Sequence, residues 1–364
     1  MGQRANTTPT EGPIAALSKS ADRRRAERPS HRPWHQRRGG GTTSVLERNR
    51  TEAGRRSGKG PWQRGRRIAV PAVLSAAVMP GHAWVPNGLG NFGSLLGTFL
   101  PWLGVSAPIL LVLAVLRRSA TATVAVLLSA VIWCSLFGAT LADKRSGGGN
   151  LTVVSHNVHN QNPDPGGTAR SLAASGADLV SLEELTSHTA PVYERALASA
   201  YPYHAVRESA GLWSKYPLHN VSPVAIMPWT RALRATVDTP KGPLAVCTAH
   251  LASVRVHLTT GFGTDRRNEA ATKLADAVRA ESLPRVVMVG DFNGTTDDTA
   301  LRPLTAQLQS AQEAAGDGFG FSWPAAFPVA RIDQILVKGF TPVSARTLPR
   351  TGSDHLPVAA ALRL

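Results

Sequence analysis

Uncharged apolar runs dominate the first half of the chain. No charged residue occurs from Ile68 to Leu116, and after the Arg117–Arg118 pair a second uncharged run extends from Ser119 to Ala142. A helix needs about 20 apolar residues to cross a bilayer. The first run therefore has room for two such helices and the second for one. We predict three transmembrane helices within residues 68–141, at about 68–85, 95–116 and 120–141.

After residue 150, short apolar runs alternate with longer segments of helical periodicity. Strand-like runs occupy residues 151–155, 177–182, 243–248, 285–289, 332–337 and 351–358, and helical patterns occupy 167–175, 187–200 and 268–281. This alternation predicts an α/β domain over residues 151–364, and about 214 residues are enough for one core. Residues 142–150 form a linker, which spans less than about 30 Å when extended.

Polar side chains stand at or near one end of each apolar strand. In the strongest case Gly290-Asp291-Phe292-Asn293 directly follows a β-branched run. A turn is the simple interpretation of those four residues, because Gly, Asp and Asn are turn formers. The same pattern recurs at five other strands, which favours a functional site over a set of turns. The polar residues concerned are Asn157, Glu183, Glu184, His250, Asp291, Asn293, Asp333, Asp354 and His355.

This ordered set of motifs resembles the endonuclease/exonuclease/phosphatase superfamily. The motifs occur in the same order as in that family. Asn157 is in the first motif, and Glu184 ends a segment similar to "DIIxLQE". His250 is in "HL", Asp291 and Asn293 are in "GDFN", Asp333 is in "RID", and Asp354 and His355 are in "SDH". The resemblance implies a four-layer α/β sandwich, in which two β-sheets pack face to face between helices. Two positions depart from the family: Glu183 replaces the usual Gln, and Gln334 replaces a His or Tyr. Since side chains alternate along a strand, only one of Glu183 and Glu184 faces the metal, and alignment favours Glu184.

Three of these residues are candidate metal ligands. Asn157, Glu184 and Asp354 offer oxygen ligands, which suit Mg²⁺ or Mn²⁺. The sequence has no CxxC or HExxH motif, so zinc is not indicated.

Five more of these residues are candidate catalytic groups for in-line attack of water on phosphorus. We expect His355 to act as general base or charge stabiliser, with Asp333 orienting its ring. Asp291 would orient or deprotonate the attacking water. His250 and Asn293 would donate hydrogen bonds to the non-bridging oxygens.

Several other polar residues have plainer interpretations. His159 belongs to no family motif and is expected to be a rim residue. Arg231 and Arg234 flank a strand and could bind phosphate, although a solvated face is the simpler interpretation.

Charge separates the two halves of the chain. The whole chain has a net charge of +16, but residues 150–364 have 19 Lys and Arg against 18 Asp and Glu. The excess lies in residues 1–67, with 17 basic against five acidic residues, a composition typical of a disordered tail. A nuclease usually needs a positive groove. Nucleic acid is therefore the less favoured partner, and a lipid-linked phosphate the more favoured one.

The positive-inside rule predicts the orientation. It places the basic tail and the Arg117–Arg118 loop in the cytoplasm. Three crossings then put the catalytic domain on the extracytoplasmic side, so we predict a multi-pass protein of the plasma membrane. This layout, with Phe99-Leu100-Pro101-Trp102 in the second span, resembles the membrane-anchored VanJ-type teicoplanin-resistance proteins of actinobacteria. That resemblance implies action on undecaprenyl pyrophosphate or a related cell-envelope phosphoester, and a link to antibiotic resistance. A surface endonuclease or phosphodiesterase and a non-catalytic lipid- or antibiotic-binding protein are the alternatives.

Overall fold

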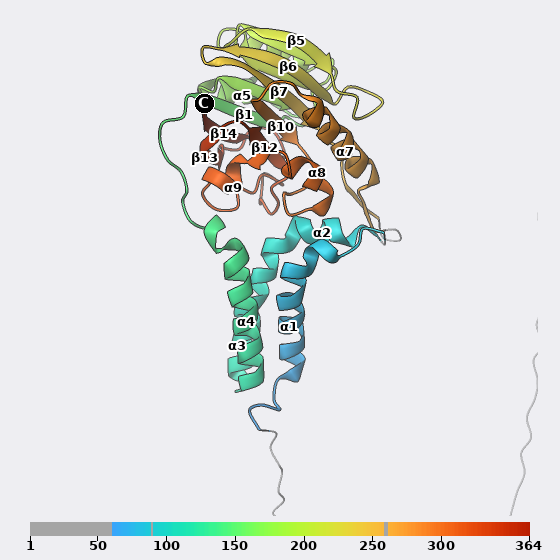
Figure 1. Cartoon of the computed structure of the whole chain (residues 1–364), viewed down its shortest axis with the longest axis vertical. Coiled ribbons are helices and arrows are strands. Elements are labelled where there is room, and N and C mark those ends of the chain that lie inside the picture. Colours follow the sequence, from blue (N-terminus) through green and yellow to red (C-terminus); the bar gives the residue numbers. More distant parts are fainter. Residues whose placement is uncertain (1–59, 89, 258–260) are drawn as a thin grey trace, which may run out of the picture. The chain divides into compact units, whose positions relative to one another are not determined.

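The computed structural model describes residues 60–88, 90–257 and 261–364. For residues 256, 257 and 261 it describes the backbone only. Most of the predicted basic tail lies outside these residues. The described residues belong to one unit, in which helices precede two β-sheets (Figure 1).

The two sheets have the same plan. In each, two central strands run parallel (β1 with β2, and β7 with β10), and the remaining pairs are antiparallel. Sheet A has the order β13 (Thr341–Thr347), β14 (Val358–Arg363), β1 (Leu151–Asn157), β2 (Leu179–Glu183), β4 (Ala210–Ser214) and β3 (Tyr203–Arg207). Sheet B has the order β11 (Gln309–Ser310), β12 (Asp333–Lys338), β10 (Val286–Asp291), β7 (Gly242–His250), β6 (Ala232–Thr239) and β5 (Leu218–Pro223). A separate hairpin joins β8 (Arg255–His257) and β9 (Gly261–Gly263).

Alternation along the strands builds three apolar layers. In β10, Val287 and Val289 lie in the core between the sheets, whereas Val286 and Met288 face the helices outside sheet B. The helical elements beside sheet B are α7 (Asp265–Ala280), η4 (Thr299–Leu301) and α8 (Arg302–Thr305); α5 (Pro165–Ala174) and α6 (Ala190–Leu197) pack outside sheet A. A short helix, α9 (Ala311–Ala315), lies beside β12 and β13. The predicted α/β sandwich of two packed sheets flanked by helices is confirmed.

One predicted strand is wrong in its placement. Residues 351–357 form a loop, and β14 begins only at Val358. The Ser353-Asp354-His355 motif therefore lies before its strand and not at the end of it. Asp333 is similar in this respect, because it is the first residue of β12.

The helices before the sandwich form a small bundle. They are α1 (Arg66–Gly81), η1 (His82–Trp84), α2 (Phe92–Phe99), η2 (Leu100–Val105), α3 (Ser106–Leu116), α4 (Ala120–Phe137) and η3 (Gly138–Thr140). Two continuous helical runs, Phe92–Leu116 and Ala120–Thr140, are long and apolar enough to cross a membrane, which by itself is weak evidence of a membrane protein. The span predicted at residues 68–85 is not confirmed. Its helix α1 has 16 residues and ends at Pro80-Gly81, so it is about 24 Å long, short of the roughly 30 Å of a hydrocarbon core.

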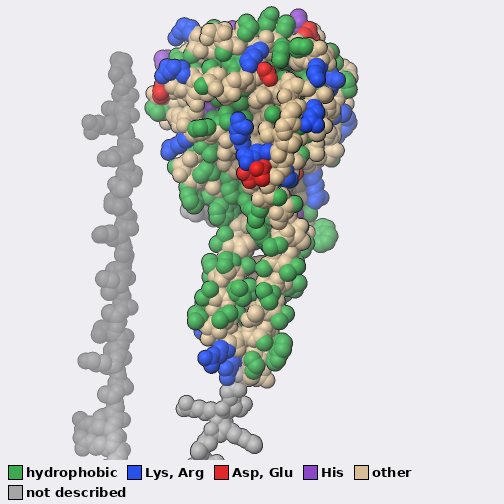
Figure 2. Space-filling view, turned by 90° about the vertical axis from the view of Figure 1, so that its left-hand side faces the viewer, with side chains coloured by type: hydrophobic (Ala, Val, Ile, Leu, Met, Phe, Trp, Pro, Cys, Tyr) green, Lys and Arg blue, Asp and Glu red, His purple; other side chains and the backbone are tan. Residues whose placement is uncertain are grey.

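Small residues lie inside this bundle and large apolar residues lie on its surface. Ala72 and Ala122 are fully buried, and Ala69 packs with Ala125 and Val126. The exposed large residues include Val70, Val73, Leu74, Ile109, Val112, Leu113, Val115, Leu116, Val124, Leu127, Leu128 and Val131. In Figure 2 the bundle surface is mainly hydrophobic and neutral side chains, with basic side chains at the end away from the sandwich. The outer surface of the bundle is therefore apolar.

The helix α2 is joined to the sandwich by a buried polar network. Arg267 and Asp298 form an ion pair with both side chains buried, 2.6 Å between Nη2 and Oδ2. Ser94 Oγ donates to Asp298 Oδ1 at 3.0 Å and accepts from Arg267 Nη2 at 3.1 Å. Thr295 Oγ1 donates to the carbonyl of Gly97 at 3.0 Å. The loop after Asp291 is thus held directly by the helical part, whereas the sequence predicted only a linker.

Candidate active site

The sandwich topology brings the polar strand ends to one edge. Asn157, His250 and Asp291 end the strands β1, β7 and β10, and Glu184 follows β2. The strands β12 and β14 run antiparallel to β10 and β1, so their starting residues reach the same edge. In sheet B, Asp291 is paired with His250 on one side and Asp333 on the other.

Gly290 makes the approach to this edge possible. Its φ is +140°, a conformation that L side chains rarely adopt. A Cβ at this position would lie 1.8 Å from the carbonyl oxygen of Ala249 on the neighbouring strand. The Gly of the Gly-Asp-Phe-Asn segment therefore allows β10 and β7 to stay paired as Asp291 enters the site.

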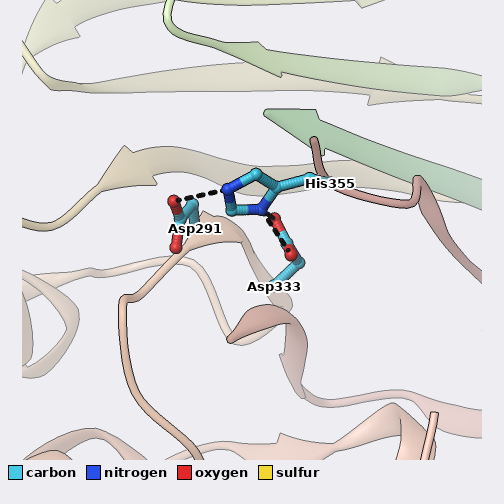
Figure 3. Close-up of side chains that lie close together, drawn as sticks. All are labelled: Asp291, Asp333 and His355. Carbon is cyan, nitrogen blue, oxygen red and sulfur yellow. Dashed lines mark hydrogen bonds and ion pairs between the residues drawn. The ribbon is translucent and has the colours of Figure 1, made fainter. Parts of the chain in front are cut away.

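His355 lies between two buried aspartates (Figure 3). Its Nδ1 is 3.1 and 2.9 Å from the two carboxylate oxygens of Asp333, and its Nε2 is 3.8 Å from Asp291 Oδ2. Burial lowers the pKa of His355, but the charges of Asp333 and Asp291 and the hydrogen bond to Asp333 outweigh it and raise that pKa to about 10. Burial raises the pKa of Asp291, against the opposing charge of His355. The pair therefore holds a proton at neutral pH, on His355.

Asn157 lies between Glu184 and Asp291. Its Nδ2 donates to Glu184 Oε1 at 3.1 Å and to Asp291 Oδ2 at 3.0 Å. The other carboxylate oxygen of Glu184 accepts from the backbone N–H of Asn160 at 3.0 Å. Asp354 is half exposed and stands slightly apart, with Oδ1 3.2 Å from His159 Nδ1. That same His159 nitrogen is 3.9 Å from Glu184 Oε2, so His159 links the two carboxylates.

Glu183 points the other way, into the interior between the sheets. It is fully buried and accepts hydrogen bonds from Ser155 and Ser181. Ser181 Oγ also lies 3.1 Å from Thr248 Oγ1 of sheet B, which places this cluster between the sheets. Glu184, with a φ of +60°, is the glutamate that reaches the candidate site.

Replacing Glu183 by Gln should stabilise the protein at alkaline pH. Burial is the main reason why the pKa of Glu183 is raised from its ordinary value of 4.5 to about 8, and the hydrogen bond from Ser181 opposes this shift. The folded chain therefore keeps a proton that the unfolded chain loses, so stability falls as pH rises through this window. Glu183→Gln cannot ionise, and we expect its apparent Tm to exceed the wild-type value by about 5 °C at pH 8 and not at pH 5. Thermal unfolding at both pH values measures this; an equal difference at the two would contradict it.

His250 is buried and close to the acidic groups. Its Nε2 lies 3.5 Å from Asp291 Oδ2 and 3.8 Å from Glu184 Oε1. Burial, followed by the charges of Arg231 and His355, lowers the pKa of His250 well below its usual range, so the ring is neutral. Asn293 Nδ2 donates to the Leu251 carbonyl at 3.1 Å and to Asp291 Oδ2 at 3.3 Å. In this arrangement Asn293 orients Asp291, and a phosphate oxygen would have to displace one of these bonds.

Two residues of the site have no family motif in the sequence. Arg231 donates through Nε to the His250 carbonyl at 3.0 Å, and its Nη2 touches the His250 ring. The β6–β7 hairpin turns at residues 240–241, and its register pairs Ala232 with Ala249, which puts Arg231 beside His250. The hairpin register could therefore have indicated from the sequence that Arg231 lies in the site. No sequence pattern indicates His159, because its position in the site depends on a backbone φ of +60° two residues after Asn157.

The donor set fits a hard divalent cation. Glu184 and Asp354 provide carboxylate oxygens on the open side of the site, with Glu184 22% and Asp354 50% exposed, and the buried Asn157 beside Glu184 adds an amide oxygen. A second group, Asp291, Asp333 and His355, has ligand atoms within 4.8 Å of one another. Both carboxylate oxygens of Asp333 already face His355 Nδ1, so the open group is the better place for an ion that keeps water ligands.

Comparisons with known proteins identify a family and several solved structures of similar fold. A family model described as "Endonuclease/Exonuclease/phosphatase family" matches residues 154–355. The crystal structure of D. rerio TDP2 complexed with single-strand DNA product is similar at 19% identity and a TM-score of 0.50, over 59% of this chain and 99% of that chain. A mannosyl-6-phosphatase of Bacteroides thetaiotaomicron is similar at 18% identity and a TM-score of 0.48, over 59% and 100%. A beta toxin mutant of Staphylococcus aureus with bound magnesium ions is similar at 15% identity and a TM-score of 0.49, over 58% and 99%. No curated protein matches the chain.

The matched family and the strand-end site define a metal-dependent phosphoester hydrolase. The chain belongs to the endonuclease/exonuclease/phosphatase family.

Proposed function

We propose that this hydrolase is anchored in the membrane and cleaves a lipid-linked diphosphate, of the undecaprenyl pyrophosphate type, at an extracytoplasmic active site with Mg²⁺. The observation that carries the proposal is the docking of the loop after Asp291 on the helix α2. Thr295 is hydrogen-bonded to Gly97, and Asp298 to Ser94, while α2 continues without a break into the apolar helix α3. A lipid in the same bilayer would reach this site by lateral diffusion.

The inside-out pattern of the bundle supports anchoring. In water, an apolar surface of this extent would favour aggregation or association, whereas lipid covers it without cost. Small residues such as Ala72 and Ala122 at the helix contacts are typical of packing within a membrane. With α1 included, we propose a bundle of three membrane helices.

The basic residues support the orientation. Ser119 Oγ donates to the Arg64 carbonyl, and Thr121 Oγ1 donates to the Trp62 carbonyl at 2.6 Å, so the start of α1 lies beside the α3–α4 turn. Five basic residues belong to the start of α1 and to this turn: Arg64, Arg66, Arg67, Arg117 and Arg118. Figure 2 shows basic side chains at the end of the bundle away from the sandwich. The positive-inside rule assigns that end to the cytoplasm and the sandwich to the opposite side.

The site geometry supports direct attack of water on phosphorus. Asn157, Glu184 and Asp354 would hold the cation, which when bound would neutralise charge on the phosphate oxygens and leaving group. Asp291, with its raised pKa, suits removal of a proton from the water. His355, protonated and fixed by Asp333, would stabilise the charge on Asp291 and the phosphoryl oxygens rather than act as the base. Neutral His250 would donate from its ring to a non-bridging oxygen.

A comparison of two substrates tests the proposal. The intact chain in detergent, with Mg²⁺, is incubated with undecaprenyl diphosphate or with plasmid DNA, and inorganic phosphate and nicked plasmid are measured. We expect phosphate release from the lipid, lost on adding EDTA and in His355→Ala. DNA nicking without phosphate release from the lipid would contradict the proposed function and favour the endonuclease alternative.

A further inference from the structure

A cavity of about 460 Å³ opens beside the catalytic centre. Its lining includes Arg231, whose guanidinium touches the His250 ring, while His250 Nε2 is 3.5 Å from Asp291. One arginine therefore belongs to both the active site and the cavity. A group bound in the cavity would be a direct neighbour of a phosphoryl group at the catalytic centre.

The cavity has a concentrated positive charge. Arg231, Arg255 and Arg266 line it against one carboxylate, Asp265. Neither Arg255 nor Arg266 forms an ion pair with any residue in the described part of the chain, and both are exposed. Since residues 150–364 are nearly neutral, three guanidiniums around one cavity are a local feature and not part of a general basic surface. Guanidinium groups are well suited to phosphate oxygens.

The same cavity has an apolar wall and faces the helical part of the chain. Met227, Trp229 and Ala252 line it, and Trp229 is 47% exposed. Next to it, Asn91 Nδ2 donates to Asp265 Oδ1 at 3.4 Å, and the backbone N–H of Phe262 donates to the Gly90 carbonyl at 2.8 Å. The cavity is therefore joined at its edge to the residues that lead into α2. The cavity thus has both a basic lining and an apolar lining. A ligand that carries an anionic group on a hydrocarbon chain would match both of them.

We propose that this cavity binds the phosphoryl group that is not attacked in a lipid-linked diphosphate, and so selects diphosphates over monophosphates. The inference rests on the proposed function. The water oxygen forms a bond to the terminal phosphorus, and the bond from that phosphorus to the bridging oxygen breaks. The bridging oxygen keeps the electron pair and leaves on the lipid monophosphate, whose added charge is neutralised by Arg231, Arg255 and Arg266. The proton of the water passes to Asp291 and then to solvent.

The test is a substrate ratio measured on the intact chain in detergent. Farnesyl diphosphate and farnesyl monophosphate serve as probes, and kcat/KM for phosphate release is measured for each with Mg²⁺. In the double variant Arg255→Gln/Arg266→Gln we expect the diphosphate-to-monophosphate ratio to fall at least about tenfold, because charge-assisted contacts to one phosphoryl group are lost. The matched control is Arg195→Gln, an exposed arginine on α6 outside sheet A, which should keep the wild-type ratio.

An unchanged ratio in the double variant would overturn the proposal. If the wild type releases phosphate from neither lipid, the proposed function fails instead. Calorimetric binding of inorganic pyrophosphate to the metal-loaded chain then tests the cavity alone: weaker binding to the double variant supports an anion site, and equal binding overturns it.

Discussion

Replacing Asp291 by Asn should lower kcat for phosphoester hydrolysis by about 10³-fold or more. General-base catalysis contributes roughly 10²–10⁴-fold, and Asp291 also accepts the hydrogen bonds that hold Asn157 and Asn293 in place. The amide has nearly the same shape but cannot take the proton from water. Phosphate release under saturating substrate and Mg²⁺ measures the loss.

A matched control separates this effect from general damage. Asp276→Asn changes an exposed aspartate on α7 that pairs only with Arg279 in the described structure, and it should keep wild-type activity. Both variants should have wild-type apparent Tm values within a few degrees. An Asp291→Asn protein within tenfold of wild-type kcat would show that Asp291 is not the base.

Replacing Glu184 by Gln should raise the Mg²⁺ concentration needed for half-maximal activity by about 100-fold. Loss of outer-shell partners alone typically costs 10–100-fold in metal affinity, and Glu184 provides a carboxylate on the open side of the site. The amide keeps the hydrogen-bonding shape but removes the negative charge. A Mg²⁺ titration of phosphate release gives the value directly.

The neighbouring Glu183→Gln is the control that the chain itself offers. It makes the same chemical change one residue away, in the interior between the sheets, and should leave the Mg²⁺ requirement within about threefold of wild type, since its side chain reaches no candidate ligand. A larger effect in Glu183→Gln than in Glu184→Gln would reverse the assignment of the two glutamates.

The candidate site was largely predictable because its residues follow short apolar strands. Short, continuous apolar runs indicate where β1, β7 and β10 end, and parallel pairing of β7 with β10 puts His250 beside Asp291. The predicted strand at residues 351–358 is wrong, because the Ser-Asp-His motif lies in the loop before β14 and not within a strand. An antiparallel strand delivers its first residues to the same edge, and apolar pattern alone does not give strand direction.

Contacts between distant segments were out of reach of the sequence. Ser94 and Asp298 are 204 residues apart, and nothing in either residue type or its neighbours indicates the other. By contrast, the sequence itself marks residues 68–85 as the weakest of the three predicted spans, because Pro71, Pro80 and Gly81 interrupt the apolar run, and α1 ends at Gly81. For Arg231 the sequence favours a solvated face over phosphate binding, whereas the hairpin register places it against His250.

The most direct test is hydrolysis of a polyprenyl diphosphate by the intact chain in water enriched in ¹⁸O, with the products analysed by mass spectrometry. Direct attack of water on the terminal phosphorus predicts one ¹⁸O atom in each inorganic phosphate released, none in the lipid monophosphate, and about 10³-fold slower release in Asp291→Asn. The label in the lipid product, or no phosphate release by the wild type, would contradict the mechanism and the proposed substrate.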